Sequence, residues 1–190
     1  MGTKEHGIKQ LSFTTLRIYD PKILAIDLRH RRFGYAVFEG HKLLLDSGLR
    51  VYRAVGEAEA AMASKRLAAL LKAFSPSAIV VKRERWDRAQ TNSHIRSLVE
   101  VMIRVTSAHS IPIYLIRHEE LRTTFRNMDC ETRDEIAAAL ARIFPELVWR
   151  LPPKRRAWQS EHPRMAMFDA IALGLAYWQH PTARIPTTPE

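Results

Sequence analysis

The chain has 190 residues, and 46% of them are hydrophobic, which suits one globular domain with a sizeable core. Its net charge of +10 favours an anionic partner, with nucleic acid first and an anionic membrane surface second. The single cysteine, Cys130, excludes an internal disulfide, and no signal-like or membrane-spanning apolar run is present, so we expect a soluble cytoplasmic protein without a membrane partner.

The predicted elements begin after a loosely ordered lead-in, residues 1–20. Three strands follow at 22–27, 33–39 and 42–51. The last two strands flank the compact turn Glu39-Gly40-His41, which predicts an antiparallel hairpin.

Beyond the hairpin, the pattern alternates between helical spacing and short β-branched runs. The further predictions are a helix over 57–74, a strand over 78–81, a helix over 91–109, a strand over 111–116, a short helix over 118–125, a helix from the Thr132–Glu135 capping box to Pro145, and a helix over 163–179. The domain thus covers 21–180, and a proline-rich tail over 181–190 is predicted to be disordered. This order predicts an α/β fold with a mixed sheet, three antiparallel strands followed by two further strands, and helices on both faces.

Three carboxylates lie in mainly apolar surroundings, where an ion is costly unless it is paired or binds a metal. Asp27 ends the first strand, Glu84 follows the strand over 78–81, and Asp169 lies in the most apolar helix. Each also has a plain structural interpretation. Asp27 could pair with Arg29 or cap a turn, Glu84 could be one solvated charge, and Asp169 could face water or join a salt bridge.

Three stretches of the chain resemble the RuvC-like branch of the ribonuclease H-like superfamily, which includes Holliday junction resolvases. Ile23-Leu24-Ala25-Ile26-Asp27, a loop and Phe33-Gly34-Tyr35-Ala36-Val37-Phe38 resemble its opening hairpin. The stretch from Arg66 to Val81 resembles its first helix and acidic strand, and Phe168 to Ala176 resembles its closing helix. The resemblance implies cleavage of a DNA junction or structured RNA, two Mg²⁺ or Mn²⁺ ions, and a homodimer.

The resemblance assigns catalysis and metal binding to Asp27, Glu84 and Asp169, but the chain departs from the family pattern. Lys82 stands where the family's glutamate is expected, and Glu84 shares its face if the strand continues. Ala166 stands where resolvases carry an acid or histidine one turn before the aspartate. Glu161 or His162 could substitute there as an extra metal ligand. The loop after Asp27 also lacks the family's usual Gly and Ser/Thr.

Basic clusters with nearby tryptophans flank the proposed acids and predict a nucleic-acid surface, since cations neutralise phosphates and aromatic rings stack on bases. The alternative is that they are solvated loops with tryptophans covering the core. The predicted binding residues are Arg29, Arg31, Arg32, Lys82, Arg83, Arg85, Trp86, Lys154, Arg155 and Arg156.

The leading functional hypothesis is a divalent-metal-dependent endonuclease acting on branched or structured nucleic acid. The first alternative is a ribonuclease H-like binding module that has lost catalysis, favoured by Lys82 and Ala166. The second is a nuclease acting on ribosomal RNA precursors, as in the YqgF branch of the superfamily.

Overall fold

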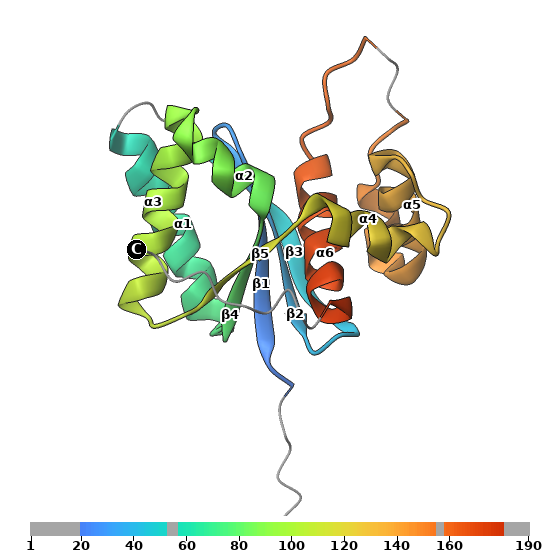
Figure 1. Ribbon diagram of the computed structural model, residues 1–190, viewed down its shortest axis with the longest axis horizontal. Helices are drawn as coiled ribbons and strands as arrows, with labels where there is room; N and C mark the ends of the chain where they lie inside the picture. Colours follow the sequence, from blue (N-terminus) through green and yellow to red (C-terminus); the bar gives the residue numbers. More distant parts are fainter. Residues whose placement is uncertain (1–19, 53–56, 155–157, 181–190) are drawn as a thin grey trace, which may run out of the picture.

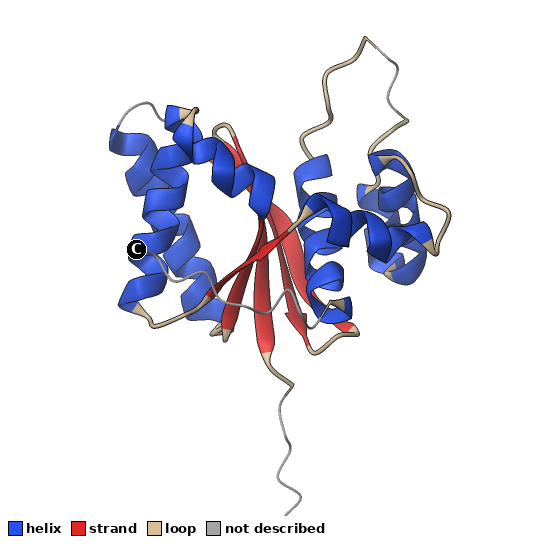
Figure 2. Ribbon diagram, viewed as in Figure 1, coloured by secondary structure: helices blue, strands red, loops and turns tan. Residues whose placement is uncertain are grey.

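The computed structural model describes residues 20–52, 57–154 and 158–180, which form a five-stranded sheet with helices on both faces (Figures 1 and 2). The strands are β1 (Lys22–Arg29), β2 (Arg32–Glu39), β3 (Leu43–Val51), β4 (Ala78–Lys82) and β5 (Ile113–Ile116). The helices are α1 (Glu57–Phe74), α2 (Arg83–Asp87), α3 (Ser93–Ala108), α4 (His118–Arg126), α5 (Arg133–Ile143) and α6 (Met165–Gln179), with short 3₁₀ helices η1 (Arg88–Gln90) and η2 (Pro145–Arg150). None of the helices described is long and apolar enough to cross a membrane.

The strand order is β3-β2-β1-β4-β5, with β1, β2 and β3 antiparallel and β1, β4 and β5 parallel. This confirms the predicted mixed sheet and the hairpin of the second and third strands, whose turn places Gly40 at a φ of 60°. The central strand β1 has six consecutive buried residues, as expected of a strand covered on both faces.

Each face of the sheet has its own hydrophobic core. Ile23 and Ala25 of β1 face the core that includes α6, whereas Leu24 and Ile26 face the core built with α1 and α3. Figure 1 shows α1 and α3 on one side of the sheet, and α6 with α4 and α5 on the other. The alternation of the strand therefore directs the odd-numbered residue Asp27 toward α6.

The chain changes from strand to helix directly after β4. The strand ends at Lys82 and α2 begins at Arg83, so the condition for Glu84 to share a face with Lys82, a strand that continues, is not met. The segment Arg83–Asp87 has no buried residue, and Arg83 pairs with Asp87 one turn later at 3.7 Å. A polar segment with helical ion pairing and nothing to bury has no reason to extend a buried strand. The predicted lead-in and tail lie almost entirely outside the described residues.

Gly34 allows the first turn of α6 to lie directly on the hairpin. It is the register partner of Asp27, and a Cβ at this position would lie 1.9 Å from the carbonyl oxygen of Ala166. Because that neighbour is backbone, only movement of the helix could relieve the clash. The glycine thus sets the distance between α6 and the end of β1.

We predict that Gly34→Ala lowers the free energy of unfolding by about 3 kcal/mol or more, because a backbone clash displaces α6. Urea unfolding monitored by circular dichroism measures the change. Gly48→Ala is the matched control, since its Cβ would lie 2.9 Å from a side-chain ring atom of Tyr35 rather than from backbone, and we expect a smaller loss. Equal losses in the two variants would contradict the close approach of α6.

Candidate acid site and nucleic-acid surface

Asp27 is a buried carboxyl group at the end of the sheet. Its side chain is 1% exposed. Burial, together with the negative charge of Asp169, raises its pKa from 3.8 to about 6, against the opposing influence of Arg29 and Arg85. The fold therefore keeps this acid in a position where ionisation is costly.

The Arg29 guanidinium lies among three carboxylates. It follows Asp27 by two residues on β1 and therefore lies on the same face of the strand. Nε donates to Asp27, Nη2 donates to Asp169 on α6, and Nη1 donates to Glu161 at 3.1 Å. One side chain thus joins acids from β1, the loop before α6 and α6 itself.

Two further arginines complete this set of charges. Arg133, at the start of α5, forms ion pairs with Glu161 and Asp169. Arg85 of α2 lies 3.7 Å from the second oxygen of Asp27. Three guanidinium groups therefore balance three carboxylates, and we call these six residues the acid site.

Lys82 lies near the acid site, whereas Glu84, predicted as a catalytic and metal-binding residue, contacts α4. Glu84 accepts a hydrogen bond from the backbone N–H of His118 at 2.7 Å, at the start of α4. Lys82 is half-buried, and its Nζ lies 3.4 Å from Nδ1 of His118. Burial lowers the pKa of Lys82, while the charges of Glu84, Asp169 and Asp27 act in the opposite direction. The lysine therefore lies within electrostatic reach of the acid site, and Glu84 contacts α4.

The carboxylates of the acid site do not fit a pair of Mg²⁺ ions as they lie. Magnesium needs oxygen ligands at about 2.0–2.1 Å in an octahedral arrangement. Here Arg29 already contacts Asp27, Glu161 and Asp169, and the six groups together carry no net formal charge. Among the described residues, one oxygen from each of these three acids cannot be chosen so that all three oxygens lie within 4.8 Å of one another. A divalent ion would first have to displace Arg29.

A cleft of about 770 Å³ adjoins the acid site. Its walls include Arg32, Arg133, Glu161 and His162, with Pro152 from the loop after η2. His162 lines this cleft, and its Nδ1 accepts the backbone N–H of Arg164 at 3.2 Å. Glu161 and His162 were the two predicted candidates for an extra metal ligand. Of these, Glu161 contacts Arg29 and Arg133 of the acid site.

The remaining cations have mixed positions. Arg31, Lys154 and Arg83 are exposed, although Arg83 is paired with Asp87. Trp86 is partly buried against the core below α1 and α3, which supports the covering role considered for it. Arg155 and Arg156 lie outside the described residues.

Sequence reasoning placed Asp27 and Asp169 but missed the bridging role of Arg29 among several acids. The signal was present, because two residues separated by two positions on a strand share a face. Arg133 could not be assigned from sequence, since its contact with Asp169 depends on how α5 packs against α6.

No family model and no curated protein matches the sequence of this chain. Its structure is similar to that of Thermus thermophilus RuvC in complex with a Holliday junction substrate, with a TM-score of 0.64, 14% identity, and coverage of 88% of this chain and 98% of that one. A second structure of Thermus thermophilus RuvC gives a TM-score of 0.62, 12% identity, and coverage of 87% and 98%.

These similarities define the class of fold. The sheet order and the closing helix over the end of β1 are those of a ribonuclease H-like domain, and the chain has the RuvC-like form of that fold. The predicted fold class is confirmed. A shared fold does not by itself transfer a function, which depends on the site.

We predict that Asp27→Asn changes how stability depends on pH. Between about pH 4 and pH 6 the unfolded chain loses the Asp27 proton while the folded protein keeps it, so wild-type stability falls as pH rises. A pKa shift from 3.8 to about 6 corresponds to a loss of about 3 kcal/mol in the free energy of unfolding, and this loss is complete above pH 6. Asparagine does not titrate, so the stability of wild type relative to the variant should fall by about this amount from pH 4 to pH 7.

Urea unfolding at several pH values measures this difference. Glu100→Gln, an exposed change on α3, serves as the control and should show little such trend. A constant difference between wild type and Asp27→Asn across the range would contradict the raised pKa.

Proposed function

We propose that this chain binds branched or structured nucleic acid, as a ribonuclease H-like module whose acid site is neutralised by its own cations. The observation that carries the proposal is the Arg29 guanidinium, which contacts Asp27, Glu161 and Asp169 together. Lys82 supports the same proposal, because it is a cation at the position where the resemblance predicts a glutamate.

The charge of the chain supports nucleic acid as the partner. The net charge is +10, and the exposed cations Arg31 and Lys154 carry no ion pair among those described for the chain. Arg32 lines the cleft beside the acid site. Phosphate neutralisation by such groups supplies sequence-independent affinity. A structural neighbour is a resolvase bound to a Holliday junction, which makes a four-way junction the first probe to use.

A metal-dependent endonuclease of the resolvase type is the second candidate. The observation that favours it is the convergence of three carboxylates from β1, α6 and the loop before α6. This function requires Arg29 to leave the acids when a divalent ion arrives. The same requirement applies to cleavage of ribosomal RNA precursors. A homodimer and a cytoplasmic location remain predictions.

We predict that the protein binds a labelled four-way DNA junction more tightly than a linear duplex of the same sequence, and that affinity falls steeply with salt. Arg31→Gln and Lys154→Gln should each reduce the slope of log K against log salt concentration by about 1 if each contacts one phosphate. Fluorescence anisotropy at several salt concentrations measures both effects.

Lys72→Gln is the matched control for binding, because Lys72 is exposed in the last turn of α1, which leads to β4 at the edge of the sheet where β1 begins. The slope of log K against log salt concentration for Lys72→Gln should equal that of wild type. Equal affinity for junction and duplex, or equal slopes in all three variants, would contradict the proposed surface.

The two candidate functions differ in cleavage. For the binding module we expect no nicking of the junction with Mg²⁺ or Mn²⁺, because Arg29 holds the carboxylates. Gel analysis after long incubation at saturating protein is the measurement. Metal-dependent nicking by wild type that is lost in Asp27→Asn, with junction binding retained, would overturn the binding module in favour of the endonuclease.

A further inference from the structure

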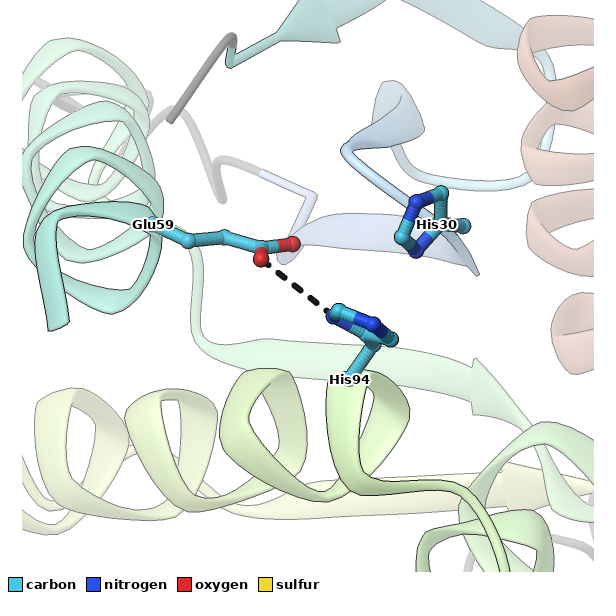
Figure 3. A group of neighbouring side chains, drawn as sticks. All are labelled: His30, Glu59 and His94. Carbon is cyan, nitrogen blue, oxygen red and sulfur yellow. Dashed lines mark hydrogen bonds and ion pairs between the residues drawn. The ribbon is translucent and has the colours of Figure 1, made fainter. Parts of the chain in front are cut away.

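His30, Glu59 and His94 form a second cluster of polar side chains, separate from the acid site. Each offers one ligand atom, and these atoms lie within 4.8 Å of one another. His30 lies in the turn between β1 and β2, Glu59 in the first turn of α1, and His94 in the first turn of α3. Figure 3 shows the Glu59 carboxylate extending toward His94, with the His30 ring beside it.

Glu59 is a buried carboxylate with an incomplete set of partners. The residue is 5% exposed, and its Oε2 lies 3.4 Å from Nδ1 of His94. Its Oε1 is buried and has no hydrogen-bond partner among the described residues. A buried ion with an unpaired oxygen is costly unless a cation or a donor completes it. The cluster therefore has an unpaired carboxylate oxygen beside the point where three ligand atoms meet.

The backbone around the cluster is held in place. The backbone N–H of Tyr52 donates to the carbonyl of Arg31 at 3.0 Å, which fixes the turn that carries His30. The Asn92 side chain caps α3 by accepting the N–H of Ile95 at 3.1 Å. Rigid elements that present ligands in advance favour ion binding.

The donor types select the kind of ion. Two imidazoles and one carboxylate suit zinc and related transition metals, whereas Mg²⁺ and Ca²⁺ prefer oxygen ligands. Ligands at about 2.0–2.2 Å around a tetrahedral zinc lie about 3.4 Å apart. The three ligand atoms here lie within 4.8 Å of one another, and those of Glu59 and His94 are already 3.4 Å apart. Three protein ligands leave the fourth position to water.

The edge-to-face contact of His30 and His94, with ring centroids 4.4 Å apart, also has an ordinary explanation as aromatic packing. That packing leaves Oε1 of Glu59 unpaired, whereas an ion would satisfy it. We propose that His30, Glu59 and His94 bind one divalent transition-metal ion of the zinc class. The site joins the β1–β2 turn to the first turns of α1 and α3, on the face of the sheet opposite α6.

The test uses the full chain without an affinity tag, freed of metal with a chelator and titrated with Zn²⁺ in a calorimeter. We expect one saturable ion per chain, and a visible absorption spectrum typical of tetrahedral coordination when Co²⁺ replaces it. His30→Gln, His94→Gln and Glu59→Gln should each weaken binding at least tenfold. Glu59→Gln matters most, because its amide can still hydrogen-bond to His94 but no longer supplies the charge.

Two variants control for other sites. His41→Gln removes an exposed imidazole on the β2–β3 turn, and Asp27→Asn alters the acid site; both should bind Zn²⁺ as wild type does. Mg²⁺ at the same concentrations should give no heat from this site. No saturable Zn²⁺ binding, or binding that persists in Glu59→Gln and His94→Gln, would overturn the proposal. Circular dichroism of each apo variant distinguishes lost ligands from lost folding.

Discussion

The contact of Arg29 with three carboxylates is the interaction on which the functional end of this molecule depends. It begins with Asp27, a carboxyl group that the sheet buries almost completely. A buried ion needs a hydrogen-bonded partner of opposite charge, and Arg29 is the nearest candidate on the same face of β1. The planar guanidinium then has donors left over, and these reach Glu161 and Asp169. The acids from distant parts of the chain are therefore gathered around a protein cation.

The residues at the end of β4 add to the positive charge around the acid site. Lys82 adds a fourth cation near Asp169 and Asp27, and Glu84 contacts the backbone of His118 at the start of α4. An additional carboxylate among the arginines would lower the net charge of the site and favour a metal. A lysine has the opposite effect. Two of the departures from the pattern that the chain resembles thus act in the same direction: Lys82 adds a positive charge, and Ala166 supplies neither an acid nor a histidine.

Much of this structure could be predicted from the sequence, because it depends on local periodicity. The strands, α1, α3, α5 and α6 follow alternation, helical spacing and the capping box at Thr132, which the structure contains with both of its hydrogen bonds. Asp27 and Asp169 were identifiable as carboxylates in apolar segments. The position of Glu84 was not predictable by alternation, since that argument requires a strand and the chain there is helical. The contacts of Arg133 and Glu161, and the cluster of His30, Glu59 and His94, join segments distant in sequence and depend on packing alone.

The turn between β1 and β2 connects the two clusters that lie on opposite faces of the sheet. Arg29 reaches Asp169 on α6, and the next residue, His30, contacts His94 on α3. Arg29 and His30 are adjacent in the chain, and side chains of adjacent residues at the end of a strand extend to opposite faces of the sheet. One turn therefore contributes a cation to the acid site and an imidazole to the cluster with Glu59 and His94.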